Sequence, residues 1–121
     1  TITVVTDADT VGVWMAVLGT NLYINYADGT TSYLKKLTFN NTVFSTISTS
    51  STTNEIVPLR TFNNKLYVKK AEGGDINIYN SSDVLIGIVD TLISSITDFI
   101  INNGVLIAYS SGTTTIKCFP V

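Results

Sequence analysis

Histidine is absent from this sequence of 121 residues, and cysteine, methionine and tryptophan occur once each. Without histidine, and with one cysteine, the chain cannot assemble a Ser-His-acid triad, a Cys-His pair or an ordinary zinc site. Its nine acidic residues stand mainly at turns, where a carboxylate commonly accepts hydrogen bonds from the backbone. We therefore expect a protein that is not an enzyme, with no catalytic residue, metal ion or cofactor.

Charge is also scarce. Charged residues make up 13% of the chain, against about 25% in an average soluble domain. Thr, Ser and Asn supply 41 of the 121 positions, so solubility depends on hydroxyl and amide groups. This composition favours an extracellular location or the surface of a virus particle. The net charge is −2 and the basic residues form no cluster longer than two, so we expect neither nucleic acid nor an anionic membrane as a partner.

Long hydrophobic runs are missing. No apolar run approaches the length of about 18 residues that a membrane-spanning helix needs, and no basic segment precedes an apolar one as in a signal peptide. We expect no membrane insertion. The chain starts at Thr1 rather than Met, as in a processed or excised piece. Cys118 has no partner for an intrachain disulfide, and its place in the alternation Thr-Ile-Lys-Cys-Phe predicts a small buried hydrophobe.

Short apolar runs cut by turn residues fill the sequence, and this pattern is typical of β-strands. No stretch has a helical spacing of apolar residues. Val11 to Leu18 is apolar nearly throughout, and we expect a strand buried on both faces. The strands are predicted at residues 1–6, 11–18, 21–26, 31–39, 43–49, 56–62, 65–71, 75–79, 84–89, 96–101, 105–110 and 113–119.

An internal repeat organises these strands. Leu22, Leu66 and Leu106 are spaced 44 and 40 residues apart, and Gly29, Gly73 and Gly112 follow them seven, seven and six residues later. A period of about 40 residues with four strands per unit is typical of a β-propeller blade. Three such units also match the length of a β-trefoil. We predict a single all-β domain with units of about 1–49, 50–91 and 92–121.

Two segments carry a resemblance to a known architecture. Asn64-Lys65-Leu66-Tyr67-Val68 and Gly104-Val105-Leu106-Ile107 resemble the second strand of blades in the generic β-propeller superfamily. Runs such as Val-Leu-Ile-Gly-Ile-Val are apolar on successive residues, which is expected when both faces of a sheet are covered. These features favour blades over a trefoil. The sequence contains no WD dipeptide, kelch doublet or NHL motif, so the resemblance transfers no functional residue.

The phase of the repeat predicts an oligomer. Read as blades, the chain starts on an outer strand, Thr1 to Thr6, and stops after the third strand of its last unit. Natural propellers have about four to eight blades, so three cannot close a ring alone. We predict that Thr1–Thr6 pairs with Thr113–Phe119 of another copy, giving a six-bladed homodimer. The trefoil alternative predicts a closed monomer.

These features predict a structural, adhesion or assembly module that meets a surface protein or a glycan. The alternative is a small carbohydrate-binding lectin, because aromatic rings presented between repeats can stack on sugars. Its predicted ligand-binding residues are Trp14, Tyr23 and Tyr67. The pairs Lys35-Lys36 and Lys69-Lys70 lie within predicted strands, where lysine commonly guards an exposed sheet edge.

Overall fold

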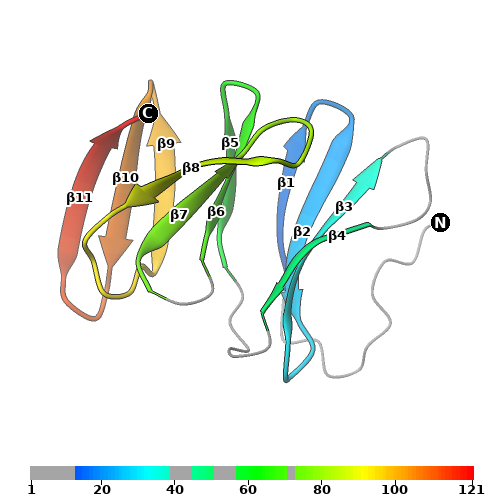
Figure 1. The fold of residues 1–121 in the computed structure, drawn as a ribbon. Coiled ribbons are helices and arrows are strands. Elements are labelled where there is room, and N and C mark those ends of the chain that lie inside the picture. Colours follow the sequence, from blue (N-terminus) through cyan, green and yellow to red (C-terminus); the bar gives the residue numbers. More distant parts are fainter. Residues whose placement is uncertain (1–12, 39–44, 51–56, 71–72) are drawn as a thin grey trace.

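The computed structural model describes residues 13–38, 45–50, 57–70 and 73–121. These residues form eleven β-strands and no helix, so the all-β prediction is confirmed (Figure 1). The strand predicted at Thr1–Thr6 lies outside the described residues. Of the other predicted strands, those at 75–79 and 105–110 match the observed bounds.

The strands form three antiparallel sheets. The first contains β1 (Val13–Leu18), β2 (Asn21–Ala27), β3 (Ser32–Thr38) and β4 (Ser45–Ser50). The second contains β5 (Leu59–Phe62), β6 (Lys65–Lys69), β7 (Asp75–Tyr79) and β8 (Leu85–Asp90). The third contains β9 (Asp98–Asn102), β10 (Val105–Ser110) and β11 (Thr115–Pro120). In each sheet the strands are hydrogen-bonded in sequence order, so every sheet is a simple meander.

Turn chemistry explains where several strands reverse. Asn63 and Asn64 have φ of 49° and 57°, and Asn103 and Gly104 have φ of 49° and 77°. Each pair forms a two-residue loop, because Phe62 pairs with Lys65 and Asn102 pairs with Val105. Two consecutive residues with positive φ define the hairpin turn whose twist matches the strands, and Asn and Gly tolerate that conformation best.

The turn between β2 and β3 depends on Asp28. Its Oδ1 accepts hydrogen bonds from the backbone N–H of Thr31 at 2.8 Å and of Thr30 at 3.0 Å. The hydroxyl of Tyr33 donates to Oδ2 at 3.0 Å. These donors, the backbone N–H of Thr31 first, lower the pKa of Asp28 from 3.8 to about 2, because they stabilise the carboxylate.

β1 differs from its prediction. Trp14 and Ala16 pack against the core, whereas Val13, Met15 and Val17 are exposed, and Met15 keeps 63% of its surface accessible. Successive strand residues point to opposite faces, so the apolar sequence of β1 provides one covered face and one exposed face. The prediction that this strand is buried on both faces is therefore wrong for the single chain.

The three sheets stack in chain order (Figure 1), and β5 contacts both β1 and β9. The core between the first two sheets is formed mainly by Leu18, Tyr23, Leu34, Leu59, Leu66 and Val68. The core between the last two is formed mainly by Tyr67, Ile76, Ile96, Phe99, Leu106 and Ala108. Leu66 and Leu106 are fully buried, and burial of such a side chain contributes about 1.5–3 kcal/mol.

Residues at equivalent positions of the internal repeat lie on equivalent faces of their sheets. We call the side of a sheet toward the preceding sheet its back face and the opposite side its front face. Leu66 and Leu106 lie on back faces, within the first and second cores respectively. Tyr23 and Tyr67 lie on front faces, within the same two cores. By strand alternation, Leu22 therefore lies on the back face of the first sheet and Ile107 on the front face of the third.

Candidate functional site

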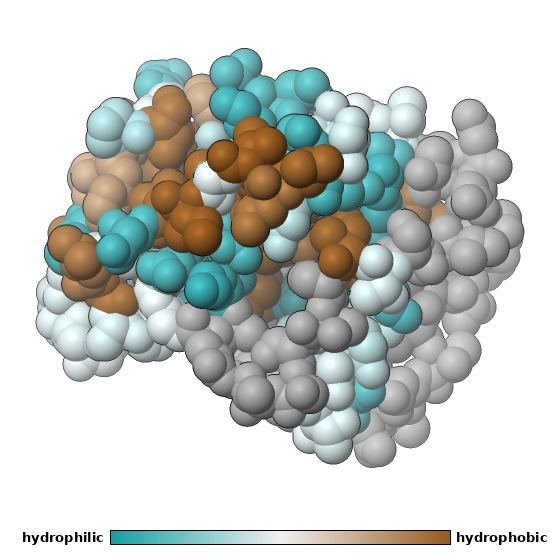
Figure 2. Space-filling view, in the orientation of Figure 1, coloured by the Kyte–Doolittle hydropathy of each residue, from teal (hydrophilic) through white to brown (hydrophobic). Residues whose placement is uncertain are grey.

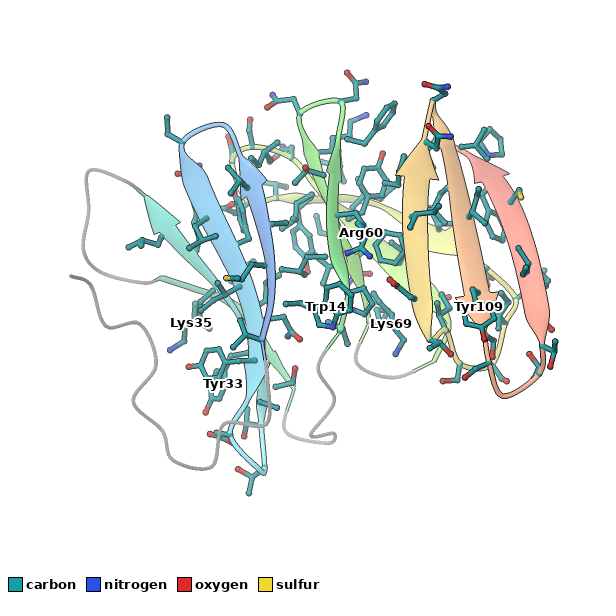
Figure 3. All side chains as sticks on the ribbon, turned by 180° about the vertical axis from the view of Figure 1, so that it is seen from behind. Trp14, Tyr33, Lys35, Arg60, Lys69 and Tyr109 are labelled. Carbon is teal, nitrogen blue, oxygen red and sulfur yellow. The ribbon has the colours of Figure 1, made fainter. Side chains whose placement is uncertain are left out.

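The first strands of all three sheets contribute to one cluster around Arg60 of β5. Its guanidinium carbon lies 4.8 Å from the ring centre of Trp14 in β1 and 5.9 Å from that of Phe99 in β9. Nη2 donates to Oδ1 and Oδ2 of Asp98 at 3.1 and 3.2 Å, and Nη1 donates to the carbonyl of Leu59 at 2.9 Å. Figure 3 shows Trp14 and Arg60 side by side in the middle of the stack.

The Arg60 side chain contacts two aromatic rings and a carboxylate in this cluster. A planar guanidinium stacks on aromatic rings and binds a carboxylate through its fork of N–H donors. Arg60 uses both properties at once, and its charge is already matched by Asp98. Within the described residues, no group of three His, Cys, Asp or Glu side chains is placed to hold a metal ion.

A second polar cluster joins β2 and β3 of the first sheet to the turn between β7 and β8 of the second sheet. The hydroxyl of Tyr23 in β2 donates to Oδ1 of Asp83 at 2.8 Å. The Nζ of Lys36 in β3 lies 2.7 Å from Oδ2 of the same carboxylate. Burial, and then the hydrogen bond to the Asp83 carboxylate, raises the pKa of Tyr23 well above its ordinary value, so this phenol stays a hydrogen-bond donor.

The turn between β7 and β8 positions Asp83. The side-chain oxygen of Asn80 accepts hydrogen bonds from the backbone N–H of Ser82 and Val84 at 2.9 and 3.0 Å. The backbone N–H of Asp83 donates to the carbonyl of Asn80 at 3.0 Å, and Asp83 adopts a φ of 64°. Asp and Asn are the side chains that best tolerate such a conformation. Asp83 therefore lies at a turn, as predicted for most of the acidic residues, and it also forms an ion pair that the sequence did not predict.

Asn25 forms another connection that sequence reasoning missed. Its amide nitrogen donates to Ser32 Oγ at 3.1 Å and to the carbonyl of Tyr33 at 2.9 Å. Its oxygen accepts from the backbone N–H of Val57 at 2.5 Å. Asn25 is buried, and these bonds offset the cost of removing its amide from water. In a chain so rich in asparagine, nothing in the sequence distinguishes this one.

The three residues predicted to bind a ligand are divided between two cores. Trp14 and Tyr23 belong to the core between the first and second sheets, whereas Tyr67 belongs to the core between the second and third. Tyr23 and Tyr67 are 1% and 2% exposed, so their rings contact other side chains rather than solvent. Burial also raises the pKa of Tyr67. Carbohydrate binding stays a prediction, and titration of the Trp14 fluorescence with sugars would test it.

Three lysines of the two predicted pairs lie in described strands, and for these three the predicted role is wrong. Lys35 and Lys36 belong to β3, and Lys69 belongs to β6; both strands have a hydrogen-bonded neighbour on each side. None of the three therefore guards a sheet edge. Lys36 pairs with Asp83, Lys69 is 1% exposed, and Lys35 Nζ lies 5.4 and 5.2 Å from the ring centres of Tyr26 and Tyr33.

The front face of the third sheet is apolar and open. A hollow of about 250 Å³ is lined there by Asp98, Phe99, Ile100, Ile107, Tyr109 and Ile116. Cys118 pairs with Ile107 in the strand register and is exposed. The prediction that Cys118 is buried is therefore wrong. The alternation of side chains along β11 does place Cys118 on the apolar front face of the third sheet, but the single chain does not cover that face.

Figure 2 shows a further gathering of apolar side chains on the side of the molecule that carries β8. Leu85, Ile86 and Ile88 of that edge strand are about half exposed. In the part of the chain that the structure describes, no helix is long and apolar enough to cross a membrane. No protein-family model matches the chain, and comparison with curated proteins finds no match.

Proposed function

We propose that this chain is a non-enzymatic assembly module whose sheets are propeller-type blades and whose complete form is a ring of two or more copies. The observation that supports this most strongly is the arrangement of the sheets. All three are meanders, they stack in chain order (Figure 1), and β5 lies in contact with both β1 and β9. Successive propeller blades are related in this way. A trefoil would instead close its strands into a barrel.

The third sheet supports the oligomer. It contains three strands where the other two contain four, and β11 is one of its two edge strands among the described residues. An exposed strand edge presents unpaired N–H and C=O groups that accept a further strand. Thr1 to Thr6, which lies outside the described residues, has the β-branched sequence Thr-Ile-Thr-Val-Val-Thr that suits this role. We infer that it pairs with β11 of another copy.

The composition of the chain supports its proposed setting. With few charges and many hydroxyl and amide side chains, the module suits an extracellular surface or a virus particle, where it would hold a partner surface protein or glycan at a rim of loops. Loops carried by a rigid sheet scaffold are the usual place for such contacts.

The mass of the protein in solution tests this proposal. Light scattering after size-exclusion chromatography should give twice 13.1 kDa for a two-chain ring. Val4→Pro should dissociate the oligomer because proline removes a backbone donor from the exchanged strand, whereas the matched Val4→Ala should leave it assembled. A stable monomer of 13.1 kDa at all concentrations would overturn the proposal.

A further inference from the structure

The front face of the third sheet is built like an internal face of the stack but is not covered by a described strand. Ile107 lies on it at the repeat position of Tyr23 and Tyr67, as described above. Ile107 pairs with Ile100 of β9 and Cys118 of β11, and Tyr109 pairs with Ile116. Ile116 is 67% exposed. The sheet therefore presents a continuous apolar surface across its three strands.

The back face of the first sheet, at the other end of the stack, is also partly open. Val13, Met15 and Val17 form an exposed apolar row along β1. Figure 3 shows Lys35 and Tyr33 on the first sheet and Tyr109 on the third, at opposite ends of the molecule. Each end thus carries an apolar sheet face that belongs to the same series of faces as the buried ones.

Both internal contacts follow one rule. The front face of the first sheet packs on the back face of the second, and the front face of the second packs on the back face of the third. At these contacts Tyr23 and Tyr67 lie on the front faces, and Leu66 and Leu106 on the back faces, with each side chain at most 2% exposed. In the described residues, the front face of the third sheet and the back face of the first sheet have no facing sheet. A second copy can supply a back face for the one and a front face for the other.

We propose that the front face of the third sheet binds the back face of the first sheet of a second copy. This inference rests on the proposed assembly and names the surfaces that hold it together. The contact joins two different patches, so it repeats head to tail until it closes. Two copies then give six sheets in series, a number within the usual range of about four to eight blades.

Charged substitutions on the two faces provide the first test. Ile116→Asp alters the front face of the third sheet and Met15→Asp alters the back face of the first, and both positions are more than 60% exposed in the single chain. Each variant should raise the dissociation constant of the oligomer at least about tenfold, because its carboxylate would be buried without a partner. Leu92→Asp is the matched control, because Leu92 is 79% exposed and lies in neither face. It should assemble like the wild type.

Mixing the two variants distinguishes a head-to-tail contact from a contact between identical faces. The Ile116→Asp chain keeps an intact back face and the Met15→Asp chain keeps an intact front face. An equimolar mixture should therefore form a heterodimer through one restored contact, whereas each variant alone stays monomeric at the same concentration. A Met15→Asp variant that assembles normally, or a mixture that stays monomeric, would overturn the inference.

Cys118 reports on the same face without any substitution. Its thiol should react with a maleimide at least about tenfold more slowly in the assembled wild type than in the diluted monomer, because the reagent needs the exposed form. Equal rates would overturn the inference.

A wild type that never oligomerises defeats both the assembly proposal and this inference. An oligomer that survives Ile116→Asp and Met15→Asp defeats the inference alone and leaves strand exchange in place.

Discussion

Lys36 of the first sheet and Asp83 of the second form an ion pair across 47 residues of sequence, with 2.7 Å between Nζ and Oδ2. The hydroxyl of Tyr23 donates to the other oxygen of the same carboxylate. The side chains of the pair are 17% and 25% exposed, so this interaction is screened less than one at the surface. It adds a specific contact to the hydrophobic packing of the two sheets.

Removing the Asp83 carboxylate should destabilise the protein. Asp83→Ala leaves the Tyr23 hydroxyl and the Lys36 ammonium without their acceptor, and should lower the free energy of unfolding by about 1–3 kcal/mol. Asp83→Asn keeps an oxygen acceptor and tolerates the positive φ, so it should cost clearly less. Urea unfolding measures both values. In a double-mutant cycle with Lys36→Met, purely additive effects would show that the two side chains do not interact.

The turn at Asp28 predicts a pH dependence on the acid side. The pKa of Asp28 is about 2 in the folded chain and ordinarily 3.8. A lowered pKa in the folded state stabilises the protein above the ordinary pKa, and this contribution is lost as the pH falls from about 4 to about 2. The Asp28→Asn protein should lose less stability over this pH range than the wild type, because it has no carboxylate at this position to protonate. Thermal unfolding of both proteins between pH 2 and pH 6 measures the difference, and parallel curves would contradict the role of these hydrogen bonds.

Trp14 allows a direct test of the Arg60 cluster because it is the only tryptophan. Arg60→Ala removes the guanidinium from its ring and opens that side to water, so the emission maximum should shift to longer wavelength. Arg60→Lys keeps the charge but not the planar stacking surface, and should give an intermediate shift. Asp98→Asn is the control that weakens the ion pair while leaving the guanidinium in place. An unchanged spectrum in Arg60→Ala would show that Arg60 does not shield the ring.

Gly74 is the glycine whose replacement should be most damaging. A Cβ at this position would overlap the backbone carbonyl of Ile93, and the Gly74 carbonyl accepts a hydrogen bond from Thr91 Oγ1 at 2.6 Å. Gly74→Ala should therefore cost about 1–3 kcal/mol or more, as overpacking does. Gly87→Ala, in β8, is the control, because its Cβ would meet only Ile78 Cδ1 at 3.6 Å. Equal losses in thermal unfolding would contradict the close approach at Gly74.

The local pattern of apolar and turn residues was sufficient to predict that the described strands exist. β7 and β10 were predicted with their observed bounds because turn residues flank both, and the Leu22, Leu66 and Leu106 alignment placed equivalent residues on equivalent faces. Alternation reports only that successive side chains point apart. It cannot show which face is covered, which explains the errors at β1 and Cys118.

The local sequence pattern could not predict contacts between residues that are distant in the sequence. The pairing of Lys36 with Asp83 and the stacking of Arg60 on Trp14 depend on how whole sheets are placed against one another. The lysine pairs were misassigned for a related reason. Sequence order alone does not show that β3 and β6 are interior strands. Nor does it show that Lys36 pairs with Asp83 or that Lys35 lies over the ring of Tyr26.

Every hydrogen-bonded strand pair in the described residues joins neighbours in the sequence. Each hairpin closes a short loop, and short loops cost little chain entropy, so a sheet can form as soon as its own strands have left the ribosome. Synthesis would thus let the three described sheets form one after another, each before the next has emerged.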